Sequence, residues 1–283
     1  MRRDPRQFGI EGTRWTLAAI HEVCDWLRTV SIGGVHRLLE RLRVTWKQAR
    51  AHIHSPDPAY LEKLAFITDL QQQVRASDGR LVLLYLDEFT SYRQPAVAHA
   101  YDERGRHQPL AELSCRADTL TRIVGALNLV DGRVFFLRRK KIGLTILVTF
   151  YRMIRRAFPT AERIYVVQDN WPNHFHPDVL VALEPQDCRW PYHQPSNWPV
   201  EPNPSARRQY EGLHLPIQLV PLPTYASWTN PIEKLWRKGR QEVLHLHRLA
   251  DQLDELRAQF DHFLSAFANG SRELLRYVGL SPG

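Results

Sequence analysis

Residues 166–175, "VVQDNWPNHF", place an acidic turn directly after an apolar run. The two valines are β-branched and favour a strand, whereas Asp169, Asn170 and Pro172 favour a turn. A strand that ends in this way predicts a carboxylate at the edge of a sheet. Acids are also common where strands reach the surface, and Asp-Asn suits a turn or a helix cap. Asp169 therefore needs partners elsewhere in the chain before it indicates a function.

A second apolar run also ends in an acid. The segment "LVLLYL", residues 81–86, is the continuous hydrophobic run expected of a strand covered on both faces, and Asp87 follows it directly. If the strands that precede Asp87 and Asp169 are parallel neighbours, the two carboxylates meet at one edge of the sheet. The alternative is that each strand simply ends at the surface.

Glu233, in "TNPIEKLW", is the third candidate acid. In this segment Asn230 suits an N-cap and Pro231 the first helical position, so that Glu233 completes a capping-box pattern. Glu233 is either a capping residue alone or a carboxylate that a helix carries to the same sheet edge. Three converging carboxylates would suit two divalent cations, which take oxygen ligands and activate water for phosphodiester chemistry.

The rest of residues 81–283 predicts a mixed α/β sheet flanked by helices. Asp131-Gly132 lies between two β-rich runs and predicts a hairpin. Further strands are expected at 163–168 and 215–223, and helices at 143–158, 176–183, 230–247 and 249–268.

Residues 185–212 contain six prolines and four aromatic residues and are expected to be an irregular insertion. A surface insertion of this length costs little stability. It is either a floppy loop or a DNA contact made by its aromatic residues with Arg207 and Arg208.

The first 56 residues predict a basic helical unit, and residues 57–80 a helix that links it to the sheet. Apolar residues recur at helical spacing in 14–27 and 35–44, with "TVSIGG" between them and Thr16 suited to a cap. Ten Lys or Arg and five Asp or Glu give residues 1–54 +5 of the +8 formal charge. This pattern fits a helix-turn-helix and also a plain helical hairpin with a solvated basic face. The predicted DNA contacts are His36, Arg37, Arg41 and Arg43 on the second helix, then Lys47 and Arg50.

Composition excludes several classes of protein. The chain has 283 residues, of which 43% are hydrophobic and 24% charged, so it is neither disordered throughout nor built from membrane-spanning segments. Its three cysteines are far apart and odd in number, which excludes a disulfide framework and indicates a reducing compartment. Residues 1–12, "MRRDPRQFGIEG", lack the hydrophobic core of a signal peptide, and we expect none there. We expect a cytoplasmic, nucleoid-associated protein whose basic charge suits a polyanionic partner.

Several segments together resemble the DDE transposases of the mariner-like superfamily, especially its bacterial insertion-sequence branch. The family's first acid, next strand and turn, central hairpin, second acid and third acid are matched by "LYLDEF", "AYDERGRHQPL", "VGALNLVDGRV", "IYVVQDNWPNHF" and "LPTYASWTNPIEKLW". The N-terminal unit is similar to the helix-turn-helix domain that precedes this core in the family.

The resemblance implies a ribonuclease H-like core at 81–283, with two Mg²⁺ or Mn²⁺ ions. The implied catalytic and metal-binding residues are Asp87, Asp169 and Glu233, and the supporting residues are Glu88, Asn170, His174 and Asn230. His174 would orient a water, a phosphate or a carboxylate, or else cap the next helix. The implied function is a transposase that binds terminal inverted repeats and target DNA as a homodimer and then cuts and joins strands. The alternative is an inactive relative that regulates by binding DNA.

Two features depart from the family's pattern. Asp169 and Glu233 are separated by 233 − 169 − 1 = 63 residues, more than is usual in this branch, because of the 185–212 insertion. Only one helix-turn-helix unit precedes the core, whereas relatives often carry two. The first departure does not affect the predicted chemistry, and the second concerns recognition of the element's ends.

Overall fold

A computed structural model describes residues 3–46, 54–105, 107–187, 189–192 and 194–281. The chain divides into two compact units, Met1–Ile53 and His54–Gly283. Lys47 and Arg50, two of the predicted DNA contacts, lie outside the described residues. Within the described part, no helix is long and apolar enough to cross a membrane.

The first unit contains two α-helices, α1 (Leu17–Val23) and α2 (Ile32–Arg41). The sequence predicted the cap of α1, and Thr16 Oγ1 accepts a hydrogen bond from the Ala19 backbone N–H at 3.1 Å. Ser31 caps α2 in the same way, with 3.2 Å to the Gly34 N–H. Short 3₁₀ turns occur at Pro5–Phe8 and Asp25–Leu27, and the buried residues Ile20, Leu27 and Val35 join the helices.

Two details of the first unit differ from the prediction. The "TVSIGG" segment is not all turn, because α2 already begins at Ile32. Arg43 is not on the helix: α2 ends at Arg41, and Arg43 has a φ of 56° in the turn that follows. The run of apolar residues up to Val44 suggested a longer helix, but Val44 N–H bonds back to Leu39 and closes the turn instead.

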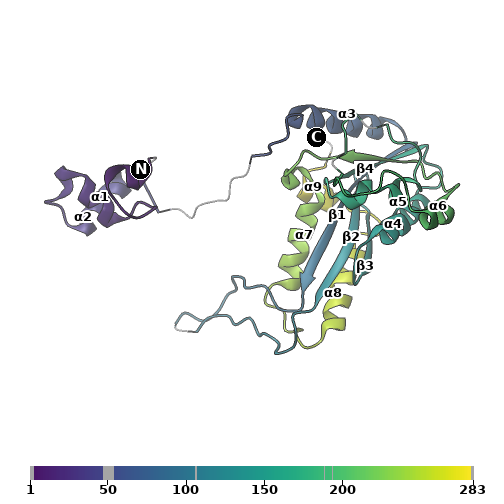
Figure 1. Cartoon of the computed structure of the whole chain (residues 1–283). Coiled ribbons are helices and arrows are strands. Elements are labelled where there is room, and N and C mark those ends of the chain that lie inside the picture. Colours follow the sequence, from purple (N-terminus) through teal and green to yellow (C-terminus); the bar gives the residue numbers. More distant parts are fainter. Residues whose placement is uncertain (1–2, 47–53, 106, 188, 193, 282–283) are drawn as a thin grey trace. The chain divides into compact units, whose positions relative to one another are not determined.

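The second unit is built on a five-stranded mixed sheet in the order β3-β2-β1-β4-β5 (Figure 1). The strands are β1 (Leu81–Tyr92), β2 (Leu120–Asn128), β3 (Val134–Arg139), β4 (Arg163–Gln168) and β5 (Ile217–Pro221). The first three form an antiparallel meander, while β4 and β5 run parallel to β1. This is the ribonuclease H-like arrangement, and it confirms the predicted fold class.

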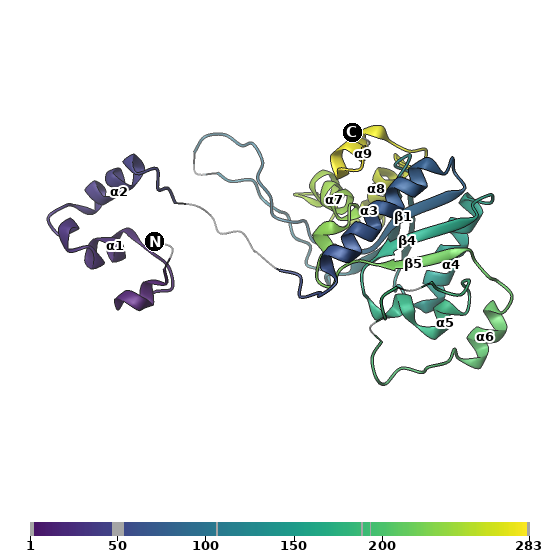
Figure 2. The ribbon, with the colours of Figure 1, turned by 90° about the horizontal axis from the view of Figure 1, so that it is seen from above.

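Helices cover both faces of the sheet (Figure 2). One face packs against α3 (Tyr60–Ala76), α7 (Ile232–Gly239), α8 (Leu253–Ser265) and α9 (Arg272–Val278). The other packs against α4 (Leu144–Ala157), α5 (Pro177–Leu180) and α6 (Pro204–Tyr210). Alternate residues of β1 enter the two cores, with Leu83 and Tyr85 on the α7 side and Leu84 and Leu86 on the α4 side.

The resemblance predicted a strand in "AYDERGRHQPL", residues 100–110, and this was wrong. β1 pairs directly with β2, and the described residues of the 93–119 connection form no strand, only an isolated bridge at Ala96 (Figure 1). Residues 101–105 and 107–110 are exposed. β1 pairs with β2 over residues 84–92 and with β4 over residues 81–85, and the 93–119 connection adds no strand to either side.

The Pro-rich segment is more ordered than predicted. It contains α6, where Asn203 accepts a hydrogen bond from the Ser205 N–H and Pro204 occupies the first turn. Ala206 and Tyr210 of this helix are buried in the core on the α4 side. The segment is therefore part of the fold at its C-terminal end, not a floppy insertion throughout.

Candidate active site

The register of β1 and β4 brings the first two acids together. The last parallel pair is Tyr85 with Val167, and two residues further on lie Asp87 and Asp169. β4 ends at Gln168, as predicted, but β1 continues to Tyr92 and pairs Asp87 with Gly125 of β2. Asp87 is thus inside its strand, not at its end. It lies where β1 loses its β4 neighbour, and this opening places its carboxyl beside the turn that carries Asp169.

Asp87 and the next residue, Glu88, face opposite sides of the sheet because side chains alternate along a strand. On the α7 side, the Trp236 indole Nε1–H donates a hydrogen bond of 3.0 Å to Asp87 Oδ2. On the α4 side, Glu88 Oε1 lies 3.5 Å from His174 Nε2. The two adjacent acids therefore contribute to two different environments at one level of the sheet.

Glu233 does not form the predicted capping box. α7 begins at Ile232 and has no side-chain cap hydrogen bond. Asn230, the predicted cap, is buried, and its Nδ2–H donates to the Leu86 carbonyl of β1 at 3.0 Å. This bond ties the start of α7 to the strand residue next to Asp87, so Glu233 enters the site on the second residue of a fixed helix.

The three acids influence one another electrostatically. Burial and, to a smaller extent, the charges of Glu233, Glu88 and Asp169 together raise the pKa of Asp87 to about 8. Burial also raises the pKa of Glu233, although Arg240 and Arg237 act to lower it. The structure thus brings Asp87, Asp169 and Glu233 close enough for their carboxyl groups to act on one another.

His174 lies between two acids on the other side of the site. The ring is fully buried in the 3₁₀ turn Pro172–Phe175, and its Nε2 is 3.5 Å from both Glu88 Oε1 and Asp169 Oδ1. Burial lowers the pKa of His174, but the two carboxylates outweigh it and raise the pKa to about 9. Burial raises the pKa of Asp169, yet its contacts with His174 and with the Trp171 N–H lower the pKa overall. His174 does not cap the next helix, because His176 caps α5.

Asn170 fixes the turn that carries Asp169. Its Nδ2–H donates to the Leu222 carbonyl at 2.7 Å, which connects the turn to the end of β5. The Trp171 backbone N–H donates to Asp169 Oδ1 at 3.0 Å. The direction of the Asp169 carboxylate is therefore set by the turn itself.

The sequence matches the family described as "DDE superfamily endonuclease" over residues 82–257, a span that includes all three acids. The chain belongs to the DDE superfamily of endonucleases. No curated protein sequence matches it.

Solved structures of Mos1 mariner transposase have a similar fold. The pre-cleavage Mos1 transpososome is 14% identical at a TM-score of 0.61, and the match covers 99% of this chain and 75% of that chain. The Mos1 paired-end complex with Mn is 15% identical at a TM-score of 0.60, over 97% of this chain and 73% of that chain. At these identities the likeness establishes the fold alone.

The donor groups of this DDE-family site fit a divalent cation. One ligand atom each from Glu88, Asp169 and His174 lie within 4.8 Å of one another. Glu88 Oε1 is buried without a hydrogen-bond partner among the described atoms, and Asp87 is surrounded by like charge. Carboxylate oxygens suit Mg²⁺, and a ring nitrogen is compatible with Mn²⁺. Asp169 is common to this set and to the Asp87–Glu233 side.

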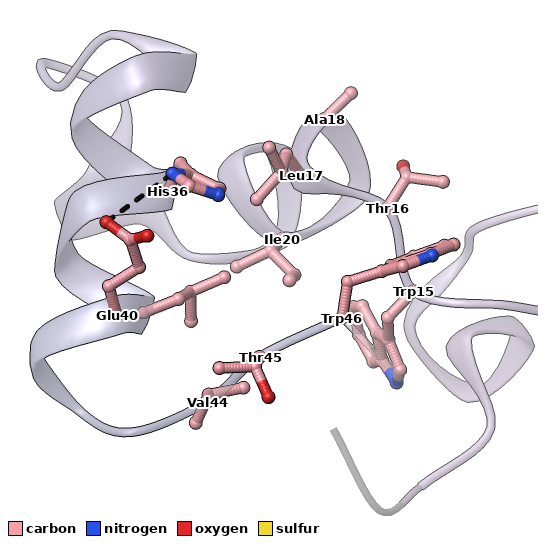
Figure 3. Close-up of a pocket in the computed structure, with 11 residues that line it drawn as sticks. Trp15, Thr16, Leu17, Ala18, Ile20, His36, Glu40, Val44, Thr45 and Trp46 are labelled. Carbon is pink, nitrogen blue, oxygen red and sulfur yellow. Dashed lines mark ion pairs between the residues drawn. The ribbon is translucent and has the colours of Figure 1, made fainter. Parts of the chain in front are cut away.

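The predicted DNA contacts on α2 differ in their surroundings. Arg37 and Arg41 are exposed and have no ion pair within the described residues. His36 is 3.7 Å from Glu40 and lines an apolar cleft of about 620 Å³ between α1, α2 and residues 44–46 (Figure 3). In this cleft the rings of Trp15 and Trp46 lie at one end and His36 at the other. Arg37 and Arg41 are thus the freer cations of this helix.

Two features of the site were missed in the sequence. Trp236 bonds to Asp87 as well as packing in the core. Gly125 makes room for it, since a Cβ there would lie 2.5 Å from the Trp236 ring. The spacing of Trp236 three residues after Glu233 was the available signal, because i and i+3 share a helix face.

Proposed function

We propose that this chain is a metal-dependent DNA transposase that cuts DNA at the ends of its element and joins the freed ends to target DNA. The observation that carries the proposal is the placement of Asp87 opposite Asp169 by the β1–β4 register, with Glu233 close enough to act on the charge of Asp87. Membership of the DDE superfamily supports this reaction class.

In this proposal Asp87, Asp169 and Glu233 hold two Mg²⁺ or Mn²⁺ ions. When bound, such ions activate a water or a 3′-hydroxyl and stabilise the leaving oxygen. Trp236 fixes Oδ2 of Asp87, and the Asn170 turn fixes Asp169. His174 supports the site by holding Asp169 and Glu88 from the other side of the sheet.

The N-terminal unit is proposed to bind double-stranded DNA through Arg37 and Arg41, with Arg43, Lys47 and Arg50 nearby in sequence. Contacts from α2 would read bases, and the remaining cations would neutralise phosphates. Two copies are expected to act together, because a transposition event joins two ends. Mos1, which shares the fold, is described in paired-end complexes with transposon ends.

Nicking of supercoiled plasmid DNA with Mg²⁺ or Mn²⁺ tests the proposal, with joining of a labelled 3′-hydroxyl oligonucleotide as a second readout. Asp87→Asn, Asp169→Asn and Glu233→Gln should each abolish both activities and leave DNA binding close to wild type. Asp69→Asn, an exposed acid on α3, is the matched control and should retain activity.

Each result has a defined meaning. Nicking without joining would identify a nuclease of the same fold. DNA binding by the wild type with no metal-dependent nicking would identify a DNA-binding regulator and reject the transposase proposal. Activity that survives all three acid substitutions would show that the site is elsewhere.

A further inference from the structure

α7 and its C-cap residue carry two arginines on the same side as Glu233. Residues 233, 237 and 240 follow the i, i+4, i+7 spacing that aligns side chains along one helix face. Arg240 keeps helical dihedrals, φ −60° and ψ −46°, at the point where α7 passes into a π-helical turn, Arg240–Leu244. A stripe of one acid and two arginines therefore leads away from the proposed metal site.

Both arginines are exposed. Within the part of the chain that the structure describes, neither Arg237 nor Arg240 makes a side-chain hydrogen bond or an ion pair. Both still act on the charge of Glu233 and lower its pKa against the effect of burial. They are thus close to the site without being neutralised by it.

Arg240 is held in place by an aromatic stack. Its guanidinium carbon lies 5.1 Å from the centre of the Phe89 ring, a cation–π contact. Phe89 stacks in turn on Trp236, with ring centres 5.1 Å apart. Because Phe89 is two residues after Asp87 on β1, it faces the same side of the sheet, and Arg240 lies over that side.

The neighbouring Lys238 provides a contrast on the same helix. Its ammonium group pairs with Glu242 and lies 5.4 Å from the centre of the Tyr277 ring. Lys238 is therefore already paired with a local acid. Arg237 and Arg240 instead present free planar donors beside a site that is proposed to cut a phosphodiester, and the guanidinium fork matches phosphate oxygens.

We propose that Arg237 and Arg240 bind backbone phosphates of the DNA strand next to the bond that is cut, and so position that strand along α7. This inference rests on the proposed function and assigns the path of the DNA at the same site.

The test uses full-length Arg237→Ala, Arg240→Ala and the double variant, with Lys238→Ala as the control of equal charge change. The rate of plasmid nicking is measured at sub-saturating DNA over a series of salt concentrations. Each arginine variant should nick on the order of tenfold more slowly, because a hydrogen bond to a charged group is lost. The salt dependence should also weaken by about 0.9 in log–log slope for each phosphate contact removed. Lys238→Ala should match the wild type in both.

Arg240→Lys separates positioning from structure. A lysine keeps the charge without the fork, so the salt slope should return to the wild-type value while the nicking rate recovers only in part. Thermal unfolding of every variant is measured in parallel. A loss of rate at an unchanged unfolding midpoint supports the proposal, and so does a restored slope in Arg240→Lys.

Wild-type rates and slopes in both alanine variants would overturn the proposal, as would an equal loss in Lys238→Ala. If the wild type does not nick at all, the proposed function fails, and the arginines are then judged by binding of a short fluorescein-labelled duplex. A binding slope that falls in the arginine variants alone would keep them as phosphate contacts, and an unchanged slope would reject them.

Discussion

Asp87 is a half-buried carboxyl group, and the charges that raise its pKa are all carboxylates. In the folded, metal-free protein its pKa is about 8, above the ordinary value of 3.8. The folded state therefore holds this proton more tightly than the unfolded chain does. The stability that this group contributes is full below pH 3.8 and is lost as the pH rises through about 8.

We accordingly expect Asp87→Asn to stabilise the metal-free protein, and more so as the pH rises from 5 to 9. An amide has no charge to bury, so the variant avoids the penalty that the ionised acid incurs. Thermal unfolding in EDTA at a series of pH values measures the difference between the variant and the wild type. A difference that stays constant over this range would contradict the assigned pKa shift.

Added Mg²⁺ or Mn²⁺ should make the wild type more stable than Asp87→Asn, the reverse of the order without metal. A cation that binds only the folded state stabilises it, by about 2.7 kcal/mol at a hundred times its dissociation constant. The wild type at pH 8 should therefore gain unfolding temperature on titration with metal, and Asp87→Asn should gain far less. Asp69→Asn serves as the control and should respond like the wild type. Equal shifts in all three proteins would place metal binding away from Asp87.

At the level of elements, α7 is positioned by its fit against the sheet. Trp236 approaches β2 so closely that only a glycine fits at 125, where a Cβ would lie 2.5 Å from the ring. Gly125→Ala should push the ring off Asp87 Oδ2, reduce nicking severely and lower stability by about 1–3 kcal/mol. Gly143→Ala is the control, because nothing lies within 4 Å of a Cβ there. Nicking and denaturant unfolding measure the two effects, and full activity in Gly125→Ala would argue against the role of Trp236.

A buried ion pair anchors the start of α3 to the loop that precedes α7. Asp57 Oδ2 accepts hydrogen bonds from Lys63 Nζ at 2.8 Å and from the Thr224 backbone N–H at 2.9 Å. The side chains of Asp57 and Lys63 are only 5% and 9% exposed. Burial acts to raise the pKa of Asp57, but these bonds lower it overall, so the stability it contributes is present above pH 3.8 and is lost in acid.

Asp57→Ala should therefore destabilise the protein by about 3–5 kcal/mol, because Lys63 is left buried without its partner. Glu201→Ala is the contrast. Glu201 pairs with Arg207 at the surface, where the side chains are 77% and 50% exposed, and such pairs contribute about 0–1 kcal/mol. Chemical denaturation at neutral pH compares the two. Similar small losses would show that the Asp57 pair is not a structural anchor.

The elements that the sequence predicted are those with strong local patterns. The apolar runs before Asp87 and Asp169 became β1 and β4, the hairpin at Asp131-Gly132 formed, and Gly132 has the expected positive φ of 73°. Helix α6 also had a local signal in Asn203-Pro204. The prolines around it concealed that signal, because they favour an irregular segment by composition alone.

The errors depend on contacts between distant residues. Asparagine is a common N-cap residue, yet the Asn230 amide donates a hydrogen bond to the Leu86 carbonyl, 144 positions away. No local pattern in the sequence indicates this long-range hydrogen bond. β1 continues past Asp87 because β2 pairs with it up to Tyr92. The cluster of Glu88, Asp169 and His174 likewise required the sheet to be assembled before it could be recognised. The sequence indicated which residues belong to the site, but it did not indicate which distant residues they contact.

For the whole molecule, the uneven charge follows the division into two units. Residues 1–54 carry +5, which leaves +8 − 5 = +3 for the remaining 229 positions. A basic first unit and a second unit that carries the acidic site agree with the proposed function, in which the first unit would bind DNA and the second would perform the chemistry. The cores are separate, since Ile20, Leu27 and Val35 form a cluster of their own.

The separate cores predict that the two tasks can be damaged one at a time. Val35, fully buried between α1 and α2, supports a unit with a small core, so Val35→Ala should remove about 2 kcal/mol and unfold much of that unit. DNA binding should fall sharply while the main unfolding transition stays in place. Val148→Ala, on α4 in the other core, should lower the main transition and leave DNA binding by the folded protein intact. Calorimetry measures the unfolding transitions, and a fluorescein-labelled duplex measures DNA binding. A single shared unfolding transition that moves in both variants would show that the units fold together.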